Sequence, residues 1–287
     1  MGHRNNRRKN LRDAVNMELR EHKSSFRVFW ALRCLVILCI VRQFFLHNYE
    51  ACFFGLLTLV LLYLPSLVQV TLKIEIPIGL EIAILFFIFA AEILGEINAF
   101  YQKIPFWDTM LHTINGFLCA AIGFSLVLLL NNNSKLTFEL SPLFLALVAF
   151  CFSMTIGVLW EFFECLMDLQ FGMDMQKDRI VDGIHTVMLD TSMTNTVINI
   201  TDIKDVILVH SDGSQEALGL GGYLDIGIID TMKDLFVNFI GAVVFSVFGF
   251  LYARSSGKKK VVSTFMPSKK TDETDYLKYV KENSEQS

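Results

Sequence analysis

Residues 107–130 read WDTMLHTINGFLCAAIGFSLVLLL, an apolar stretch with an acidic residue and a histidine in its first two turns. About 20 apolar residues in a helix span the hydrocarbon core of a membrane. The stretch therefore predicts a transmembrane helix that carries Asp108 and His112 near one end. Because a helix turns once every ~3.6 residues, these two side chains lie on the same face.

Five further stretches have a similar length and apolar character. Composition agrees, because 53% of the residues are hydrophobic, whereas soluble domains usually reach about 45–50%. We therefore expect an all-α polytopic membrane protein with six transmembrane helices. The expected spans are 28–46, 51–72, 78–98, 107–130, 142–165 and 231–253.

The first stretch is expected to be a retained helix and not a cleaved signal. Arg33 and Arg42 interrupt it, and no small-residue cleavage pattern follows. All six cysteines fall within expected spans, and no two form a C-x-x-C pair. Neither a disulfide framework nor a thiolate metal site is therefore expected.

Basic residues indicate that both ends of the chain are cytoplasmic. Residues 1–27 form a basic N-terminal segment, and residues 254–287 form a charged tail that begins with a lysine cluster. The positive-inside rule places such segments in the cytoplasm. We expect a multi-pass protein of a bacterial plasma membrane whose basic segment meets lipid headgroups and no nucleic acid. The tail from about residue 261 is expected to be mobile.

Residues 28–168 are expected to contain the first five membrane helices, and residues 230–253 the sixth. Residues 169–229 lie between them and lack the long apolar stretches of the helices. Apolar and polar residues alternate at 196–200 and 206–210, and a hairpin-type turn follows at 211–214. This pattern predicts a small β-rich extracytoplasmic insertion. The glycines at 219–222 match no nucleotide-binding spacing and are expected to form a flexible entry to the last helix.

Acidic residues gather at the ends of four expected helices. Because the helices alternate in direction, all four ends are expected at the outer leaflet. Within each set the residues are three, four or seven positions apart, so each set lies on one helical face. The candidate ligands are Glu92, Glu96, Asp108, His112, Glu161, Glu164, Asp168, Asp230 and Asp234.

These carboxylates predict a cation or proton site. Ionised carboxylates near lipid cost a few kcal/mol each on lenient scales, so they must pair, take up protons or bind cations. Oxygen ligands with one imidazole suit Mg²⁺, Mn²⁺, Ca²⁺, Zn²⁺ or Fe²⁺, and a divalent metal ion is the expected cofactor.

Simpler roles are open for several of these residues. Asp108 and Asp230 have the position of helix caps. His112 alone has the character of a hydrogen-bonded core histidine, and Asn115 and Asn238 that of interhelical hydrogen-bond partners. If these simpler roles are the only ones, the acidic residues of the four helix ends do not form one common cation site.

An internal repeat favours the shared site. The fourth span begins Asp-Thr-Met-Leu-His at 108–112, and the sixth begins Asp-Thr-Met-Lys-Asp at 230–234. A helix with two glutamates precedes each. The repeat predicts two parallel helical hairpins related by a pseudo-two-fold axis along the membrane normal. Carboxylates would then project inward, as in soluble di-metal four-helix proteins.

The same motifs resemble an uncharacterised bacterial inner-membrane family that includes YjdF. The likeness covers about residues 80–253, and the insertion is similar to that of a Gram-positive-type member. The resemblance implies the topology and a bacterial origin but supplies no reaction. It rests on Glu92/Glu96, Trp107-Asp108-x3-His112-x3-Gly116, Trp160-Glu161-x2-Glu164-x3-Asp168 and Asp230-x3-Asp234-x6-Gly241.

Three functions are consistent with these features. The first is a metal-dependent hydrolase of a lipid or envelope precursor at the outer leaflet, with Glu161 or Asp234 as base and His112 as ligand or acid. The second is a cation- or proton-coupled transporter. The third is a non-enzymatic assembly or protective protein, monomeric or homo-oligomeric, with a structural ion. The hydrolase is the leading hypothesis.

Overall fold

The computed structural model describes residues 2–131, 140–255 and 267–285. The chain forms two compact units. Unit 1 comprises Met1–Gly157 and Val237–Ser287, and unit 2 comprises Val158–Phe236. Each unit is described by itself below.

The six expected membrane helices are present. Six helical segments among the described residues are long and apolar enough to cross a membrane. They confirm the predicted fold class and number of spans. Their bounds are α2 Lys23–Phe45, α3 Tyr49–Leu61 with α4 Leu64–Leu72, α5 Ile78–Phe89 with η1 Ala90–Ile97, α7 Trp107–Asn131, α8 Pro142–Phe171 and α9 Ile228–Arg254.

Two of these spans are not uniform α-helices. The second divides before Pro65, which lies in the first turn of α4, because proline lacks the N–H that would continue the α3 hydrogen bonds. Pro77 is the N-cap of α5. The third span ends in the π-helix η1, a rare conformation that is often found at functional sites.

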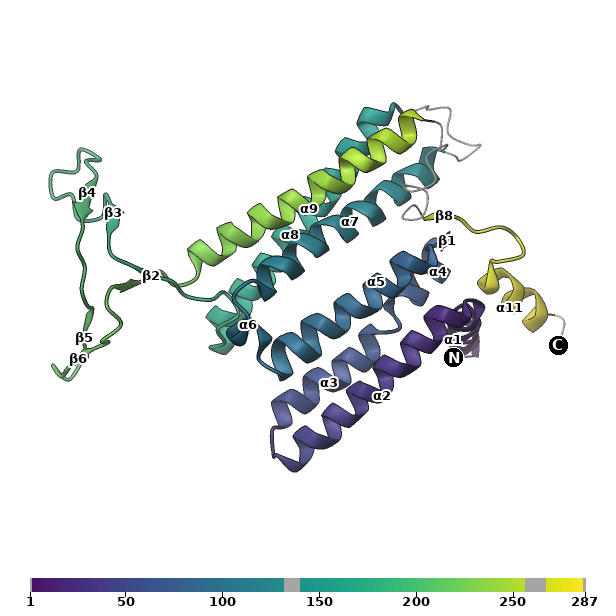
Figure 1. Cartoon of the computed structure of the whole chain (residues 1–287), viewed down its shortest axis with the longest axis horizontal. Helices are drawn as coiled ribbons and strands as arrows, with labels where there is room; N and C mark the ends of the chain where they lie inside the picture. The colour runs from purple at the N-terminus through teal and green to yellow at the C-terminus, as the bar shows by residue number, and fades with distance from the viewer. Residues whose placement is uncertain (1, 132–139, 256–266, 286–287) are drawn as a thin grey trace. The chain divides into compact units, whose positions relative to one another are not determined.

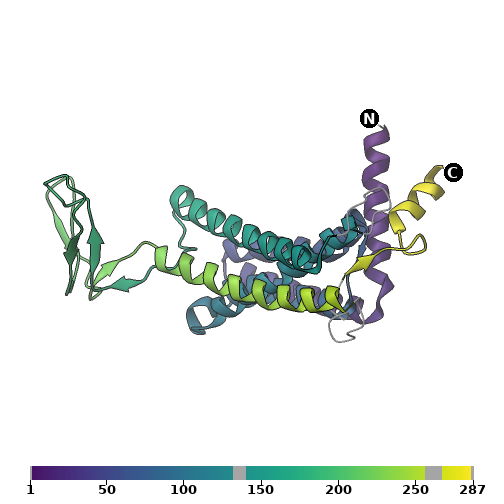
Figure 2. The same ribbon diagram turned by 90° about the horizontal axis from the view of Figure 1, so that it is seen from above.

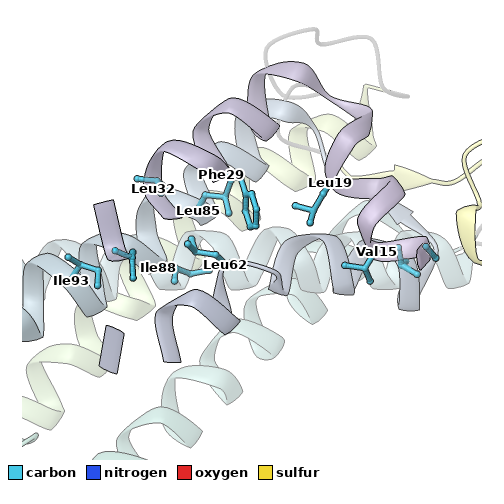
Figure 3. Packing of buried hydrophobic residues seen from close by; sticks show 11 residues of the cluster. Val15, Leu19, Phe29, Leu32, Leu62, Leu85, Ile88 and Ile93 are labelled. Carbon is cyan, nitrogen blue, oxygen red and sulfur yellow. The ribbon is translucent and has the colours of Figure 1, made fainter. Parts of the chain in front are cut away.

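The apolar core of the N-terminal half of unit 1 joins α1 (Gly2–Glu21), α2, α3 and α5 with η1. Figure 3 shows its side chains gathered between these helices. Burial of each large aliphatic or aromatic side chain contributes roughly 1.5–3 kcal/mol. The labelled members are Val15, Leu19, Phe29, Leu32, Leu62, Leu85, Ile88 and Ile93.

Two glycines let α7 and α9 approach closely in unit 1. A Cβ atom on Gly116 would lie 2.1 Å from the backbone oxygen of Asn238, and one on Gly241 would lie 2.0 Å from that of Thr113. Small residues at such crossings allow membrane helices to pack backbone to backbone. Asn115 donates to Asn238 across the crossing at 3.3 Å, which confirms the expected interhelical partners.

The two ends of the chain pack together in unit 1. Strand β1 (Ile74–Glu75) pairs antiparallel with β8 (Ser268–Lys269), and helix α11 (Tyr276–Glu285) packs against α1. Figures 1 and 2 show α1 and α11 side by side. The expectation of a mobile tail is therefore wrong for residues 267–285, because buried ion pairs hold this segment in place.

The insertion in unit 2 is built from short antiparallel strand pairs, as predicted. In the β5–β6 turn the His210 N–H donates to the Ser214 carbonyl and the Gly213 N–H donates to the His210 carbonyl, with Gly213 at φ +83°. The glycines at 219–222 lead into strand β7. The pairs are β2 (Ile180–Val181) with β7 (Tyr223–Leu224), β3 (Ile184–Thr186) with β4 (Ile198–Ile200), and β5 (Ile207–Val209) with β6 (Gln215–Ala217).

Candidate functional site

Four of the predicted ligands lie in unit 1, and we call them the His112 group: Glu92, Glu96, Asp108 and His112. The π-helix η1 carries the two glutamates, and the first two turns of α7 carry the other two residues. The short helix α6 (Phe100–Lys103) connects these elements, and η1 packs against both α6 and α7.

Aromatic contacts fix this connection. The rings of Phe100 and Trp107 meet edge to face with centroids 4.9 Å apart, an arrangement that stabilises beyond the area buried. The ring of Tyr101 lies so close to Gly95 that a Cβ there would be 2.4 Å from it. Trp107 therefore orients the start of α7.

Asp108 and His112 are in direct contact. The Nε2 atom of His112 lies 3.4 Å from Oδ1 of Asp108, and their side chains are only 11% and 23% exposed. The i,i+4 spacing on one helical face produces this contact, as the sequence predicts. Glu92 is half-buried and Glu96 is exposed on the neighbouring η1. An imidazole beside a carboxylate, as in His112 and Asp108, is a ligand pair that suits divalent transition metals.

The other five predicted ligands lie in unit 2, and two of them hold the insertion. Asp168 accepts hydrogen bonds from the backbone N–H groups of Met175 and Gln176 at 2.6 and 2.8 Å. Asp230 accepts from Arg179 at 2.9 Å and from the backbone of Lys177 at 3.1 Å. These bonds give both carboxylates a structural role, while their role as metal ligands stays a prediction.

The remaining three are Glu161, Glu164 and Asp234. The indole N–H of Trp160 donates to Glu164 at 2.9 Å, one helical turn away. Glu161 and Asp234 are 4% and 2% exposed. Lys233 lies 3.5 Å from Asp234 and supplies part of the compensating charge. That these residues act together with the His112 group, as the internal repeat implies, stays a prediction from the sequence.

Sequence reasoning missed Asp225, which anchors the start of α9. Its carboxylate accepts from the backbone N–H groups of Arg179, Gly227 and Ile229 at 2.6, 3.3 and 2.9 Å. Burial alone would raise the pKa of Asp225, but these three hydrogen bonds outweigh it and hold the pKa below its usual value. The signal was an aspartate directly before a helix start, where carboxylates commonly cap free N–H groups.

Comparison with known proteins gives a family but no activity. A family model described as "Predicted membrane protein (DUF2238)" matches residues 28–255. This range includes every residue of the predicted site and all six membrane helices, apart from the first five residues of α2. No curated protein and no solved structure matches the chain.

Proposed function

The chain belongs to the DUF2238 family of predicted membrane proteins, and we propose that it is a metal-dependent hydrolase embedded in the membrane. Its substrate class is a lipid or a lipid-linked envelope precursor that reaches the site from the bilayer surface. The site combines the His112 group, as the metal-binding part, with Glu161 or Asp234 as the base predicted from the sequence.

The contact between Asp108 and His112 is the observation that supports this proposal. Their Nε2 and Oδ1 atoms are 3.4 Å apart on one helical face, so one ion between the two side chains can be bound by both. Metalloenzymes use two ligands at i,i+4 on a helix in this way. The π-helix η1 beside α7 supplies Glu92 as a further carboxylate at the same end of unit 1.

A divalent ion bound there would polarise a scissile ester or phosphoryl group and lower the pKa of a bound water. Asp108, Glu92 and His112 supply ligands, and His112 alternatively protonates the leaving group. Glu161 and Asp234, both buried in unit 2, are the candidates for taking the proton from water. In this low-dielectric setting each charge acts more strongly than it would in water.

Metal analysis of the detergent-purified protein, followed by a hydrolysis assay, tests the proposal. We expect the Asp108→Asn/His112→Ala variant to contain about one equivalent of transition metal less than the wild type. Asp202→Asn/His210→Ala is the matched control, because both side chains are exposed in the insertion. It should retain the metal and the hydrolysis of lipid phosphates or lipid-linked pyrophosphates.

A second variant separates the base from the ligands. In Glu161→Gln/Asp234→Asn the His112 group is unchanged, and hydrolysis should fall by at least the 10²-fold that general bases contribute. Metal-free wild-type protein in a folded, monodisperse sample contradicts the metal site. Full hydrolysis by the second variant contradicts the assigned base. Ion flux into proteoliposomes without hydrolysis would identify a transporter instead.

A further inference from the structure

A second group of ionisable residues lies in unit 1, at the end where α1, β1 and β8 meet (Figure 1). We call Glu21, His22, Glu75 and Glu81 the Glu75 cluster. Glu21 ends α1, His22 is the N-cap of α2, Glu75 lies in β1 and Glu81 lies in the first turn of α5. Four separate segments therefore contribute one residue each.

Three of these residues have the geometry of a metal site. One ligand atom from each of Glu21, His22 and Glu75 lies within 4.8 Å of the other two. The turn at His22 creates this arrangement, because α1 ends there and α2 leaves in a crossing direction (Figure 2). The imidazole is thereby placed between a carboxylate of α1 and one of β1.

Two buried carboxylate oxygens in the cluster accept no hydrogen bond among the described residues. Glu81 is only 4% exposed, and its carboxylate interacts electrostatically with both His22 and Glu21. Among the described residues, no donor is in hydrogen-bond geometry with the buried Oε2 of Glu81 or the buried Oε2 of Glu21. The Ser25 hydroxyl interacts with the Glu81 carboxylate, and Lys270 approaches Oε2 of Glu21 only to 4.0 Å. A buried carboxylate oxygen without a donor is costly, so both atoms indicate a ligand.

The neighbouring lysines make their shortest ion pairs with carboxylates outside the cluster. The Nζ atom of Lys270 lies 2.7 Å from both oxygens of Glu18 and 4.0 Å from Glu21. Lys73 lies 2.6 Å from Asp275. Burial and the negative charges of Glu21 and Glu18 raise the pKa of Tyr276. The cluster thus carries an excess of negative charge.

We propose that the Glu75 cluster binds a divalent transition-metal ion through the His22 imidazole and the carboxylates of Glu21, Glu75 and Glu81. The imidazole favours a first-row ion such as Zn²⁺ or Mn²⁺ over Ca²⁺, which prefers oxygen ligands alone. The ion joins the α1–α2 junction to β1, the strand that pairs with β8. Metal binding thereby fastens both chain ends to the membrane helices, independently of the His112 group.

Zn²⁺ titration of the full, metal-stripped chain by isothermal calorimetry tests this site. The titration is carried out in the Asp108→Asn/His112→Ala background, so that the proposed hydrolase site makes no contribution. We expect one remaining equivalent of Zn²⁺, lost on addition of His22→Ala/Glu75→Gln. The matched control is His210→Ala/Glu216→Gln, an exposed His–Glu pair 3.6 Å apart in the insertion, which should leave binding unchanged.

Glu81→Gln keeps the proposal testable if the double variant fails to fold. This variant removes one buried charge and leaves the other three ligands, so Zn²⁺ affinity should fall 10–100-fold, as for other disturbed metal sites. Zn²⁺ affinity within threefold of the parent in Glu81→Gln, or in a folded His22→Ala/Glu75→Gln protein, overturns the proposal. Absence of Zn²⁺ binding in the folded parent background overturns it as well.

Discussion

The His112 group and the Glu75 cluster are two ionisable sites of unit 1 that assemble in different ways. The His112 group lies on η1 and α7, which α6 connects, and Asp108 and His112 meet because they are four residues apart on one helix. The Glu75 cluster draws one residue from each of four segments between positions 21 and 81. Spacing along the chain reveals the first kind of site, whereas only the tertiary fold reveals the second.

The two sites also depend on different packing. In the His112 group, His112 itself lies one helical turn before Gly116. Gly116 marks the α7–α9 crossing, where the two backbones are in contact. The Glu75 cluster lies beside the buried ion pair of Glu18 with Lys270. Substitutions at these two supports should therefore damage the sites separately.

Gly116→Ala should have the largest effect. The added Cβ would lie 2.1 Å from the Asn238 oxygen and 3.1 Å from the Ala242 nitrogen. Because both contacts are to backbone, the helices must separate, and the cost should exceed the roughly 1–3 kcal/mol of ordinary overpacking. Thermal unfolding in detergent should show a large decrease in Tm or loss of monodisperse protein.

Gly79→Ala is the matched control for this crossing. Gly79 also lies in a membrane helix, but a Cβ there meets nothing within 4 Å. Its Tm should equal or exceed that of the wild type, because alanine has the higher helix propensity. Equal unfolding of the two variants would show that the α7–α9 crossing is looser than its geometry indicates.

The glycines illustrate how far the sequence predicts this fold. The six spans follow from apolar length alone, and the helical faces of the acidic residues follow from spacing. Gly116 and Gly241 are visible as residues, but their contact at the crossing depends on which helices pack together. The π-helix η1 has no sequence signature of its own, since Tyr101 and α7 pack against it only in the folded chain.

The tail illustrates where charge patterns mislead. Lys270 lies in a polar, charged stretch that is typical of a solvated segment, yet its side chain is 2% exposed. Its partner Glu18 is 252 residues away in the sequence. No local pattern indicates a pair of this kind, which is why the ordered segment 267–285 was not predicted.

Lys270→Met should have the next largest effect, at the support of the Glu75 cluster. The substitution leaves Glu18, which is 5% exposed, as a buried charge without its partner. Breaking a buried pair in this way costs about 3–5 kcal/mol. We expect a lower Tm and faster proteolysis of residues 267–285, measured by mass spectrometry.

Lys278→Met is the control, because Lys278 pairs with Asp272 at the exposed surface. Exposed pairs contribute little to stability, so both the Tm and the proteolysis rate should stay near wild type. A similar response of the two lysine variants would contradict a role for the buried pair in holding the tail.

Glu18 should also make stability depend on pH. Burial raises the pKa of Glu18 from 4.5 to about 7, more than the opposing contact with Lys270 lowers it. A carboxyl whose folded pKa is raised binds protons more tightly in the folded state. Its contribution to the free energy of unfolding therefore falls as pH rises from about 4.5 to about 7, by roughly 3 kcal/mol, and is constant above that range.

Comparison of wild type with Glu18→Gln isolates the pH-dependent contribution of Glu18 to the free energy of unfolding. Glutamine has the neutral charge of the protonated carboxyl and does not titrate, so the difference in Tm between the two proteins should change across pH 4.5–7 and level off above it. Parallel Tm curves for the two proteins would show that Glu18 titrates near its ordinary value.

Asp230→Asn should have the smallest effect. It tests whether breaking an ion pair costs less when the cation is exposed than when it is buried, as Lys270 is. Like Glu18, Asp230 is buried and paired with cations, but its partners Arg179 and Lys233 are 48% and 32% exposed. Water can therefore solvate the arginine after the substitution, and asparagine still accepts from the Lys177 backbone. We expect the free energy of unfolding to fall by about 1–2 kcal/mol, with faster proteolysis at the start of the insertion.

Asp202→Asn, in an exposed pair with Lys204, should change neither quantity. A loss as large as that of Lys270→Met would show that exposure of the partner does not set the cost.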